Sequence, residues 1–528
     1  MDQARRGADA VIGRMLDRRT FLRATAGLGG LALLQPLTSA CGGTSGGSGS
    51  GAGKDEVIYA YKSDVGTLDA QMTTDTTTQN VLHQIFEPLV KMGRDGNFEG
   101  VLAESWELVD DRTWKFNLRR DVTFHNGEPF NADAVKFSFE RVVDPNLNSP
   151  AAPGFTAIDH VEVIDDYTVH IVTKDPYAAT LSMLYALYIV PPQYITENGD
   201  EAFATNPVGT GPFKFVEWQR DVHVKMEAYE GHWRGKPAIS KLTFRPIPED
   251  SARIAALQNG EVDWIAAVTV DRVRELEDDD RLQIGIRPGQ GIYAGIDTLR
   301  VEPFKDRRVR QALNYAANID SIINDILDGR ATRLPSAFFM ATPGYDPDLE
   351  PYPYDPERAK ALLAEAGYPD GFEFELNVPV GLQATQKLQE VGEALASDFS
   401  QVGLRPTIRV IDPGTAFDIY RAGQFQFYIY PWGSSHESGR YIETLLHSET
   451  RGYYYQNPEA DVLIEEYMTT VDPDARIEVG KRLNEYLKED APWVFMYQEP
   501  DIYGYSKDID WQPNPHDIYF HAYEIKFK

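Results

Sequence analysis

FEFELNV (Phe372–Val378) is the first of three short apolar segments that predict β-strands; the others are PTIRVI (Pro406–Ile411) and FQFYIY (Phe425–Tyr430). Between the first two, apolar residues recur at helical spacing from Leu388 to Val402, and a second helix is predicted at Thr415–Ala422. Strands that alternate with helices through short links form a parallel sheet covered by helices. This stretch therefore predicts an α/β fold.

The neighbouring segments extend this pattern in both directions. Asp355 followed by Pro356 predicts the start of a helix, which Gly367 would end. Further helices are predicted at Arg307–Ala317, Ile319–Leu327, Pro458–Thr469 and Pro473–Lys488, and a strand at Trp493–Tyr497.

The N-terminal half has a different pattern, with more strands and irregular segments. TWKFNL (Thr113–Leu118) alternates apolar and polar residues as a half-buried strand does. Asn131 is placed to cap a helix with one apolar stripe, and Val161–Val172 reads as a hairpin. A strand is expected at Val57–Lys62 and a helix at Thr76–Leu89.

Residues 1–40 read as an export signal. Arg18 and Arg19 precede an apolar run from Ala24 to Leu37, which is too short to cross a bilayer because a span takes ~20 residues. The paired arginines resemble a twin-arginine signal. No other stretch approaches the length of a membrane span.

Cys41 is the only cysteine in the chain and directly follows Ala40. This position resembles a bacterial lipoprotein cleavage site, so we expect lipidation at Cys41 and a Gly/Ser tether over residues 41–54. The alternative is a hydrophobic leader with an incidental cysteine. Lipidation would hold the body beside the membrane rather than inside it.

Length and charge limit the classes of function. The 528 residues are too many for one hydrophobic core and enough for two or three domains. The formal net charge of −30 repels phosphate backbones, so we expect no nucleic-acid partner.

Motifs for catalysis, metals and cofactors are weak. Gly43–Gly47 matches G-x-S-x-G but lies in the tether, and Gly289–Ala294 matches a dinucleotide fingerprint without a helix after it. The ten histidines lack ligand spacing, and Asp278–Asp280 lacks the spacing of a calcium loop. We therefore expect no enzyme activity, no metal and no cofactor.

One site-like feature follows the strand Phe425–Tyr430. Open α/β sheets bind ligands beyond the carboxyl ends of their strands. At that point the sequence places a tryptophan, small polar groups and a His/Glu pair, which are Trp432, Ser434, Ser435, His436 and Glu437. The tryptophan could stack on a ligand, or it could simply plug the end of the sheet.

Several long segments, in order, resemble the extracellular solute-binding proteins of the peptide/nickel class, family 5. The longest is LAESWELVDDRTWKFNLRRDVTFHNGEPFNADAVKFSFERV at Leu102–Val142. The others are NPVGTGPFKFVEW (Asn206–Trp218), Ala228–Ile265, Pro303–Asp320, Tyr354–Phe372 and NPEAD (Asn457–Asp461). The resemblance covers practically the whole chain after the tether.

The resemblance implies a bilobal, periplasmic-binding-protein-like α/β fold of type II that closes on its ligand. Lobe I would comprise residues 55–285 with 500–528 returning to it, and lobe II residues 290–493. Two hinge crossings would lie near 286–298 and 494–500. Only a ligand that contacts both lobes shifts such a protein towards the closed state.

The resemblance also implies ligand-binding residues. Peptide binders of the family place an Asp about three residues after the tryptophan that matches Trp432, where it pairs with the free amine of the peptide. Here that place is Ser435, and Glu437 is a nearby carboxylate. Asp297 stands at the first crossing, where relatives often have Asn, and would add negative charge near the cleft.

The resemblance implies a substrate-binding component of an ABC importer. It would capture a peptide or, alternatively, an oligosaccharide or another small polar solute. The partners would be that ligand, the permease subunits and, through the lipid anchor alone, the membrane; the protein itself would be a monomer. A secreted acidic hydrolase is the alternative from another class, but no convergent catalytic set supports it.

Overall fold

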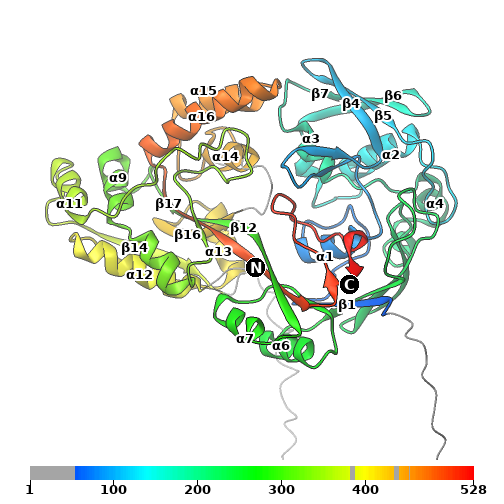
Figure 1. Cartoon of the computed structure of the whole chain (residues 1–528). Coiled ribbons are helices and arrows are strands. Elements are labelled where there is room, and N and C mark those ends of the chain that lie inside the picture. Colours follow the sequence, from blue (N-terminus) through cyan, green and yellow to red (C-terminus); the bar gives the residue numbers. More distant parts are fainter. Residues whose placement is uncertain (1–53, 381–386, 433–438, 451) are drawn as a thin grey trace, which may run out of the picture. The chain divides into compact units, whose positions relative to one another are not determined.

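One large sheet runs through the part of the chain that the computed structural model describes, residues 54–380, 387–432, 439–450 and 452–528 (Figure 1). Its strands, in spatial order, are β15 (Arg405–Ile411), β14 (Glu373–Pro379), β16 (Phe427–Trp432), β12 (Leu282–Ile296), β17 (Trp493–Ser506), β11 (Trp264–Ile265), β1 (Glu56–Tyr61), β10 (Lys241–Pro246), β9 (His223–Ala228) and β8 (Phe213–Gln219). The short strand β13 (Thr332–Arg333) pairs with β17.

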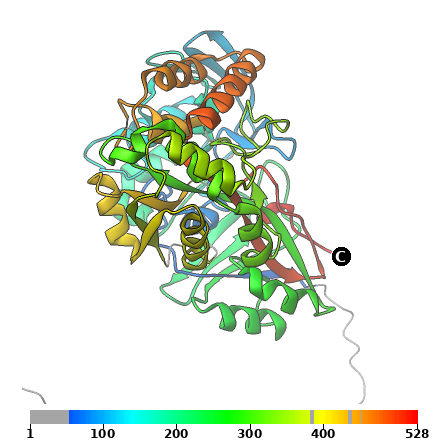
Figure 2. The ribbon, with the colours of Figure 1, turned by 90° about the vertical axis from the view of Figure 1, so that its left-hand side faces the viewer.

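The C-terminal end of this sheet confirms the predicted α/β alternation. Strand β14 pairs in parallel with both β15 and β16. The intervening helices are α12 (Leu388–Gln401) and α13 (Pro413–Arg421), and α12 packs on β14 and β15. Figure 2 turns the molecule so that α12 and the capped helix α11 (Pro356–Glu365) face the viewer. The side chain of Asp355 accepts a hydrogen bond from the Arg358 amide, as the predicted cap requires.

The remaining helices of the C-terminal half confirm those predicted at Arg307–Ala317, Pro458–Thr469 and Pro473–Lys488, and include two, at 302–305 and 439–446, that were not predicted. They are α8 (Glu302–Lys305), α9 (Arg307–Ala316), α10 (Ile319–Ser321), α14 (Gly439–Leu446), α15 (Pro458–Thr469) and α16 (Pro473–Asp490). The helix expected over Ile319–Leu327 is not uniform, because Ile322–Ile326 widens into a π-helix.

The N-terminal half contains a second sheet of four antiparallel strands: β4 (Ala103–Asp110), β5 (Thr113–Leu118), β7 (Thr168–Thr173) and β6 (Ile158–Asp165). Strands β6 and β7 form the predicted hairpin. Two small antiparallel pairs, β2 (Val90–Met92) with β3 (Phe98–Gly100) and β18 (Ile509–Asp510) with β19 (Lys526–Phe527), complete the strands.

The helices of this half are shorter. They are α1 (Thr76–Leu82), α2 (Ala132–Val143), α3 (Thr180–Tyr185), α4 (Pro192–Asn198), α5 (Asp200–Phe203), α6 (Asp250–Gln258) and α7 (Val273–Glu277). Asn131 caps α2 by accepting a hydrogen bond from the Ala134 amide, as predicted. The helix expected over Thr76–Leu89 ends at Leu82, and beyond it the carbonyls of Gln84 and Ile85 accept hydrogen bonds from the amides of Phe213 and Gly211 instead of from a further helical turn.

Strands β12 and β17 are the long elements that connect the two halves of the large sheet. They pair antiparallel from Leu282 opposite Ser506 to Gly295 opposite Trp493. Strand β17 is much longer than the segment Trp493–Tyr497 that its sequence predicts, because β12 supplies hydrogen bonds along its whole length.

Two hydrophobic clusters take residues from opposite ends of β17, and the first of them also takes residues from β12. The β14 cluster combines Ile292 and Val494 with residues of β14 and α12 such as Leu376. The β1 cluster combines Tyr503 with residues of β1 and with the C-terminal tail, where Phe520 is buried. Strand β17 is therefore shared by cores on either side, and a smaller buried cluster combines Leu282 of β12 with Ile502 of β17.

Two further clusters matter below. The hairpin cluster packs α2 and α3 on β5–β7 and includes Phe155, Met183 and Leu184. The tyrosine cluster packs α14–α16 on β16 and includes Ala179, Tyr430, Ile442 and Met468. No helix among the described residues is both long enough and apolar enough to span a membrane.

Candidate functional site

A cavity of about 330 Å³ lies where β1 and β11 meet the two long strands. Its walls come from three places: the ends of β1, β10 and β11, the segment that enters α1, and the middle of β12 and β17. The lining residues used below are Tyr59, Tyr61, Arg287, Gly289, Gln290, Glu499, Asp501 and Tyr503.

The direction of the strands explains why the chain leaves a cavity here. Strand β1 pairs in parallel with β10 and β11. Ala266 and Ala267, just past the carboxyl end of β11, line the cavity together with Tyr61, the last residue of β1. This is the place where α/β sheets bind ligands. The hydroxyl of Tyr61 is buried, and burial together with the nearby Asp64 carboxylate raises the pKa of Tyr61, so the group stays a neutral polar atom in the cavity wall.

Three side chains of the long strands form one hydrogen-bonded unit in the wall. Arg287 Nε donates to the Tyr503 hydroxyl over 3.1 Å, and that hydroxyl donates to Asp501 Oδ2 over 2.7 Å. Arg287 Nη2 pairs directly with the same carboxylate oxygen and also donates to the Ile518 carbonyl at 3.2 Å. Strand β12 supplies the arginine, β17 supplies the other two side chains, and the C-terminal tail supplies the carbonyl.

The surroundings of Arg287 keep its guanidinium charged. Burial acts to lower the pKa of Arg287, but Tyr503 and Asp501 raise it more strongly, so the pKa lies above its usual value. Burial raises the pKa of Tyr503 well above that of an exposed tyrosine. The guanidinium charge is therefore permanent and already balanced by Asp501. The unit fixes the shape of the wall and leaves no unpaired buried charge of its own.

Glycines allow β12 to pass close to its neighbours beside the cavity. A Cβ at Gly291 would lie 2.1 Å from Cε1 of Phe339, so no larger residue fits there. Residues 289–294 form part of β12, with no helix after them, which agrees with the rejection of the dinucleotide motif. Within the described ranges, no group of three or more His, Cys, Asp or Glu side chains could hold a metal ion.

Comparison with known families matches residues 97–453 to "Bacterial extracellular solute-binding proteins, family 5 Middle". The chain belongs to this family. It is 30% identical over 479 residues to the glutathione-binding protein GsiB of Pectobacterium atrosepticum, covering 87% of this chain and 91% of that relative. Proteins of this family are the substrate-binding components of ABC importers and act in the periplasm or outside the cell.

Solved structures agree with the fold. HbpA2 of Haemophilus parasuis superposes with a TM-score of 0.82 at 26% identity, covering 90% of this chain and all 100% of that one. The periplasmic binding protein DppA of Helicobacter pylori, solved with the peptide STSA, gives a TM-score of 0.75 at 24% identity, with 89% and 98% covered. The expected α/β periplasmic-binding-protein fold is confirmed.

The predicted ligand loop of this solute-binding protein can be followed only to its first residue. The backbone of Trp432 lies opposite Gly291 in the β12–β16 pairing, one residue away from Gln290 in the cavity wall. Ser434, Ser435, His436 and Glu437 lie outside the described residues, as does the side chain of Trp432. Cys41 and the whole of residues 1–53 also lie outside them.

Asp297 is located one residue beyond the end of β12. Its side chain is 2% exposed and accepts hydrogen bonds from the amides of Leu299 and Arg300 at 3.0 and 3.1 Å. It also pairs with Arg300 Nε at 2.7 Å and is absent from the cavity lining. Contact between Asp297 and ligand therefore stays a prediction.

Sequence reasoning missed the unit of Arg287, Asp501 and Tyr503. One weak signal was available, since Arg287 interrupts an otherwise apolar and glycine-rich segment at a predicted crossing. Nothing in the sequence pairs it with residues more than 200 positions away, because that pairing depends on the register between β12 and β17.

Proposed function

We propose that this solute-binding protein captures a peptide or a similar small polar solute outside the cell and delivers it to an ABC permease, without catalysing a reaction. The observation that carries the proposal is the cavity at the shared strands, with walls from both β1 and the β12–β17 pair. The glutathione-binding relative and the peptide-bound structural neighbour both support a peptide-like ligand.

We also propose the lobes that the sequence suggests: residues 55–285 with 500–528, and residues 290–493, hinged near 286–298 and 494–500. The packing of β17 into both the β1 cluster and the β14 cluster supports this division. A ligand in the cavity would touch the strands on which both lobes depend, so binding would favour closure.

The ligand loop would begin at Trp432 and continue through Ser434, Ser435, His436 and Glu437. The pairing of Trp432 with Gly291 supports this, because it directs β16 to the cavity wall. Since Ser435 replaces the amine-binding Asp of peptide binders, Glu437 is the proposed carboxylate for a ligand amine.

Native mass spectrometry of the purified protein tests the function directly. A small molecule that co-purifies and dissociates on denaturation identifies the ligand, and glutathione and the dipeptide Met-Leu serve as added probes.

Trp432→Ala should then weaken binding by roughly 1–3 kcal/mol. Normal binding by the folded variant would show that Trp432 plugs the sheet and that the site lies elsewhere.

We further propose that the mature chain is a monomer anchored by lipid at Cys41 after twin-arginine export. The single cysteine directly after an apolar leader supports this. Cys41→Ser should move the protein from the membrane to the soluble fraction of fractionated cells. Unchanged membrane association of that variant would contradict the anchor.

A further inference from the structure

A short segment between β7 and α3 reaches across to helices of the other half of the molecule. The amide of Ala178 donates a hydrogen bond to the carbonyl of Met468, on α15, over 2.7 Å. The hydroxyl of Tyr177 donates to Oε2 of Glu443, on α14, over 3.1 Å. In Figure 1, β7 and α3 belong to one side of the molecule and α14 and α15 to the other.

The burial of the residues in this segment shows that the contact is closely packed. Ala179 is 1% exposed and belongs to the tyrosine cluster, although the helix that follows it, α3, packs in the hairpin cluster. Tyr177 packs against both clusters. A second bond lies close by, where Arg440 Nη2 donates to the carbonyl of Gly154 over 3.0 Å.

These contacts lie away from the two long strands, and this position indicates how they behave when the lobes move. The two halves are joined through β12 and β17, and none of Tyr177, Arg440 and Glu443 lies on those strands or lines the cavity. Contacts made away from a hinge form and break as the lobes move, whereas contacts at the hinge persist. The segment 177–179 and helix α14 are therefore placed to act on closure and not on ligand.

We propose that residues 177–179, together with Arg440 and Glu443, form a latch that holds the lobes closed in a fraction of molecules without any ligand. This rests on the proposed two-lobe function. The latch residues are positioning residues: by raising the closed fraction, they raise the apparent affinity for every ligand by the same factor.

The expected size follows from the bonds. The hydrogen bond from Tyr177 ends on a carboxylate, and loss of such a bond changes an equilibrium by roughly tenfold. Tyr177→Phe removes this hydroxyl and keeps the ring that packs on both clusters. Arg440→Gln removes the guanidinium that reaches Gly154. Each variant should lower the ratio of closed to open molecules by about tenfold.

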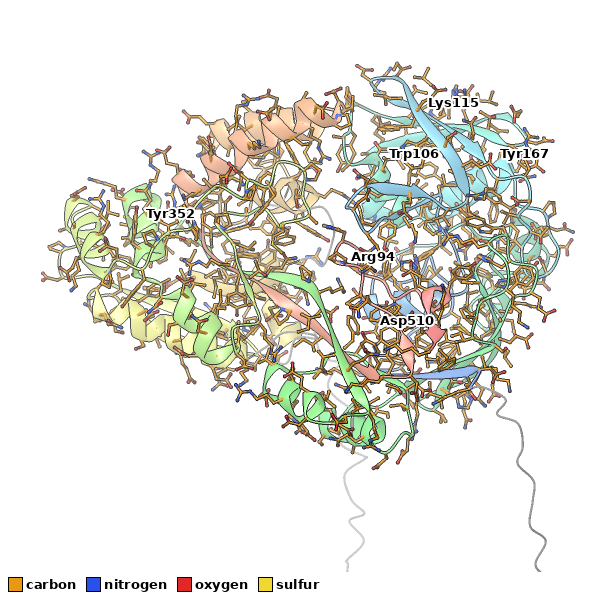
Figure 3. All side chains as sticks on the ribbon, in the orientation of Figure 1. Arg94, Trp106, Lys115, Tyr167, Tyr352 and Asp510 are labelled. Atoms are coloured by element: carbon orange, nitrogen blue, oxygen red, sulfur yellow. The ribbon has the colours of Figure 1, made fainter. Side chains whose placement is uncertain are left out.

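Single-molecule energy transfer on the full chain measures that ratio. The Cys41→Ser chain has no cysteine, so labels can be placed at Val109→Cys on β4 and Val462→Cys on α15, where the native side chains are 54% and 63% exposed. The matched control is Tyr167→Phe, which removes a tyrosine hydroxyl from the β6–β7 turn, where the ring stacks on Arg120 of the same half. Tyr167 is labelled in Figure 3.

The first measurement uses no ligand. We expect a minor closed species in the labelled parent and the control, reduced about tenfold in Tyr177→Phe and Arg440→Gln, with thermal midpoints unchanged. Equal ratios in all variants would overturn the latch, as would the absence of any closed species in the parent. Because this readout needs no ligand, it is independent of the binding assay that tests the proposed function.

Binding then separates a latch from a ligand contact. For each probe that binds, glutathione or Met-Leu, the latch variants should lose affinity by the same factor. A loss that differs between the two probes would instead place Tyr177 or Arg440 in contact with ligand and would overturn the latch.

Discussion

The carboxylate of Asp297, which the sequence suggests as a ligand contact, accepts hydrogen bonds from the backbone. Its two oxygens satisfy the amides of Leu299 and Arg300 and pair with the Arg300 guanidinium. One buried side chain therefore accepts the amide hydrogen bonds of the turn that follows β12. This local role accounts for the burial of Asp297 without any ligand.

Two substitutions at Asp297 separate a role in holding the turn from a role in binding ligand. Asp297→Asn keeps an oxygen for the two amides and loses only the pair with Arg300, whose side chain is 47% exposed, so the free energy of unfolding should fall by about 1 kcal/mol or less. Asp297→Ala leaves two amides without an acceptor and should cost about 1–3 kcal/mol. Both are measured by urea unfolding. If Asp297→Asn instead weakens ligand binding tenfold at normal stability, the side chain belongs to the ligand site.

His125 makes stability depend on pH. Its Nε2–H donates to the Gly211 carbonyl at 2.8 Å, and its Nδ1 accepts from the Gly209 amide at 3.4 Å. This arrangement needs the neutral ring. Burial, the largest cause, lowers the pKa of His125 to about 4, although the Gly211 hydrogen bond opposes the shift.

The sign of the pH effect follows from that lowered pKa. Between pH 6.5 and 4 the unfolded chain binds a proton at His125 that the folded chain does not, so stability is lost as the pH falls through this window. The loss should be on the order of 2–3 kcal/mol. His125→Gln can donate and accept in the same places without titrating, so its urea midpoint should fall less steeply from pH 6.5 to pH 4. Parallel profiles for the two proteins would contradict this account.

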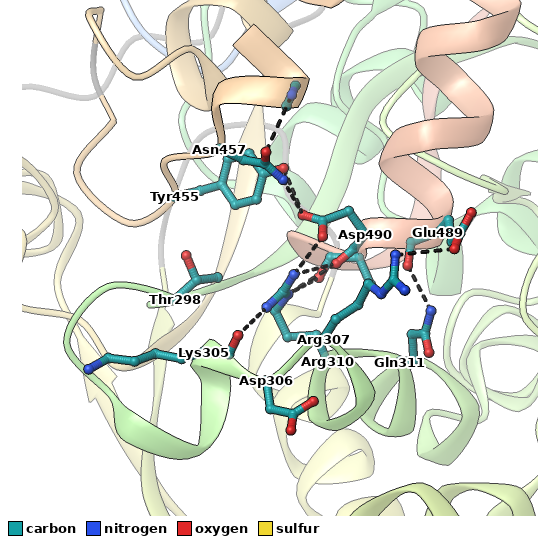
Figure 4. Close-up of polar contacts among 12 residues, drawn as sticks. Thr298, Lys305, Asp306, Arg307, Arg310, Gln311, Tyr455, Asn457, Glu489 and Asp490 are labelled. Carbon is teal, nitrogen blue, oxygen red and sulfur yellow. Dashed lines mark hydrogen bonds and ion pairs between the residues drawn. The ribbon is translucent and has the colours of Figure 1, made fainter. Parts of the chain in front are cut away.

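Helix α16 shows how one element is fixed at both its middle and its end. At its end, Asp490 Oδ1 pairs with Arg310 Nη2 at 2.9 Å, and Asp490 Oδ2 accepts from the Tyr455 hydroxyl at 2.7 Å and from Asn457 at 3.3 Å (Figure 4). Arg310 and Asn457 come from two of the segments that carry the family resemblance. Both segments therefore contribute side chains to this buried network.

The middle of α16 reverses the usual rule for glycine in helices. Gly480 lies inside the helix, where Ala is normally preferred by about 1 kcal/mol. A Cβ there would lie 2.8 Å from Cα of Gly344 and 2.9 Å from the Pro343 carbonyl oxygen, both of them backbone atoms. Gly480→Ala should therefore destabilise the protein by about 1–3 kcal/mol. The neighbouring substitution Lys481→Ala, on the exposed side, should change the urea midpoint little. A stabilised Gly480→Ala protein would show that the two segments can separate at no cost.

Local patterns predicted the elements whose shape depends on their own residues. The strands and helices from Phe372 to Tyr430 were foreseen because each has a clear period, and the caps at Asn131 and Asp355 because each depends on one side chain. Gly480 could not be explained from the sequence, since its partner Gly344 is distant in the chain. The unit of Arg287, Asp501 and Tyr503 was hidden for the same reason.

At the scale of the whole molecule, we expect the proposed lobes to hinge at β12 and β17. They lie in the middle of the large sheet, and β17 buries residues in the cores on both sides, while β12 contributes Ile292 to the β14 cluster and Leu282 to a smaller cluster with Ile502. Bending within these strands can change the angle between the cores without unpacking either one. The cavity lies beside the two strands, so we expect ligand binding there to depend on the angle between the cores.

Closure should therefore be visible as compaction. A compact chain of this length has a radius of gyration of about 24 Å, and an opened cleft makes the value larger. Small-angle scattering of the Cys41→Ser protein should show a smaller radius with its co-purified ligand, or with a probe that binds, than after ligand removal.

The comparison should be made at two salt concentrations, because the net charge of −30 favours separation of the lobes at low ionic strength. A non-binding peptide of the same charge is the control. Ligand that binds at one molecule per chain without any compaction would contradict closure, and would mean that the two long strands hold the cores at a fixed angle.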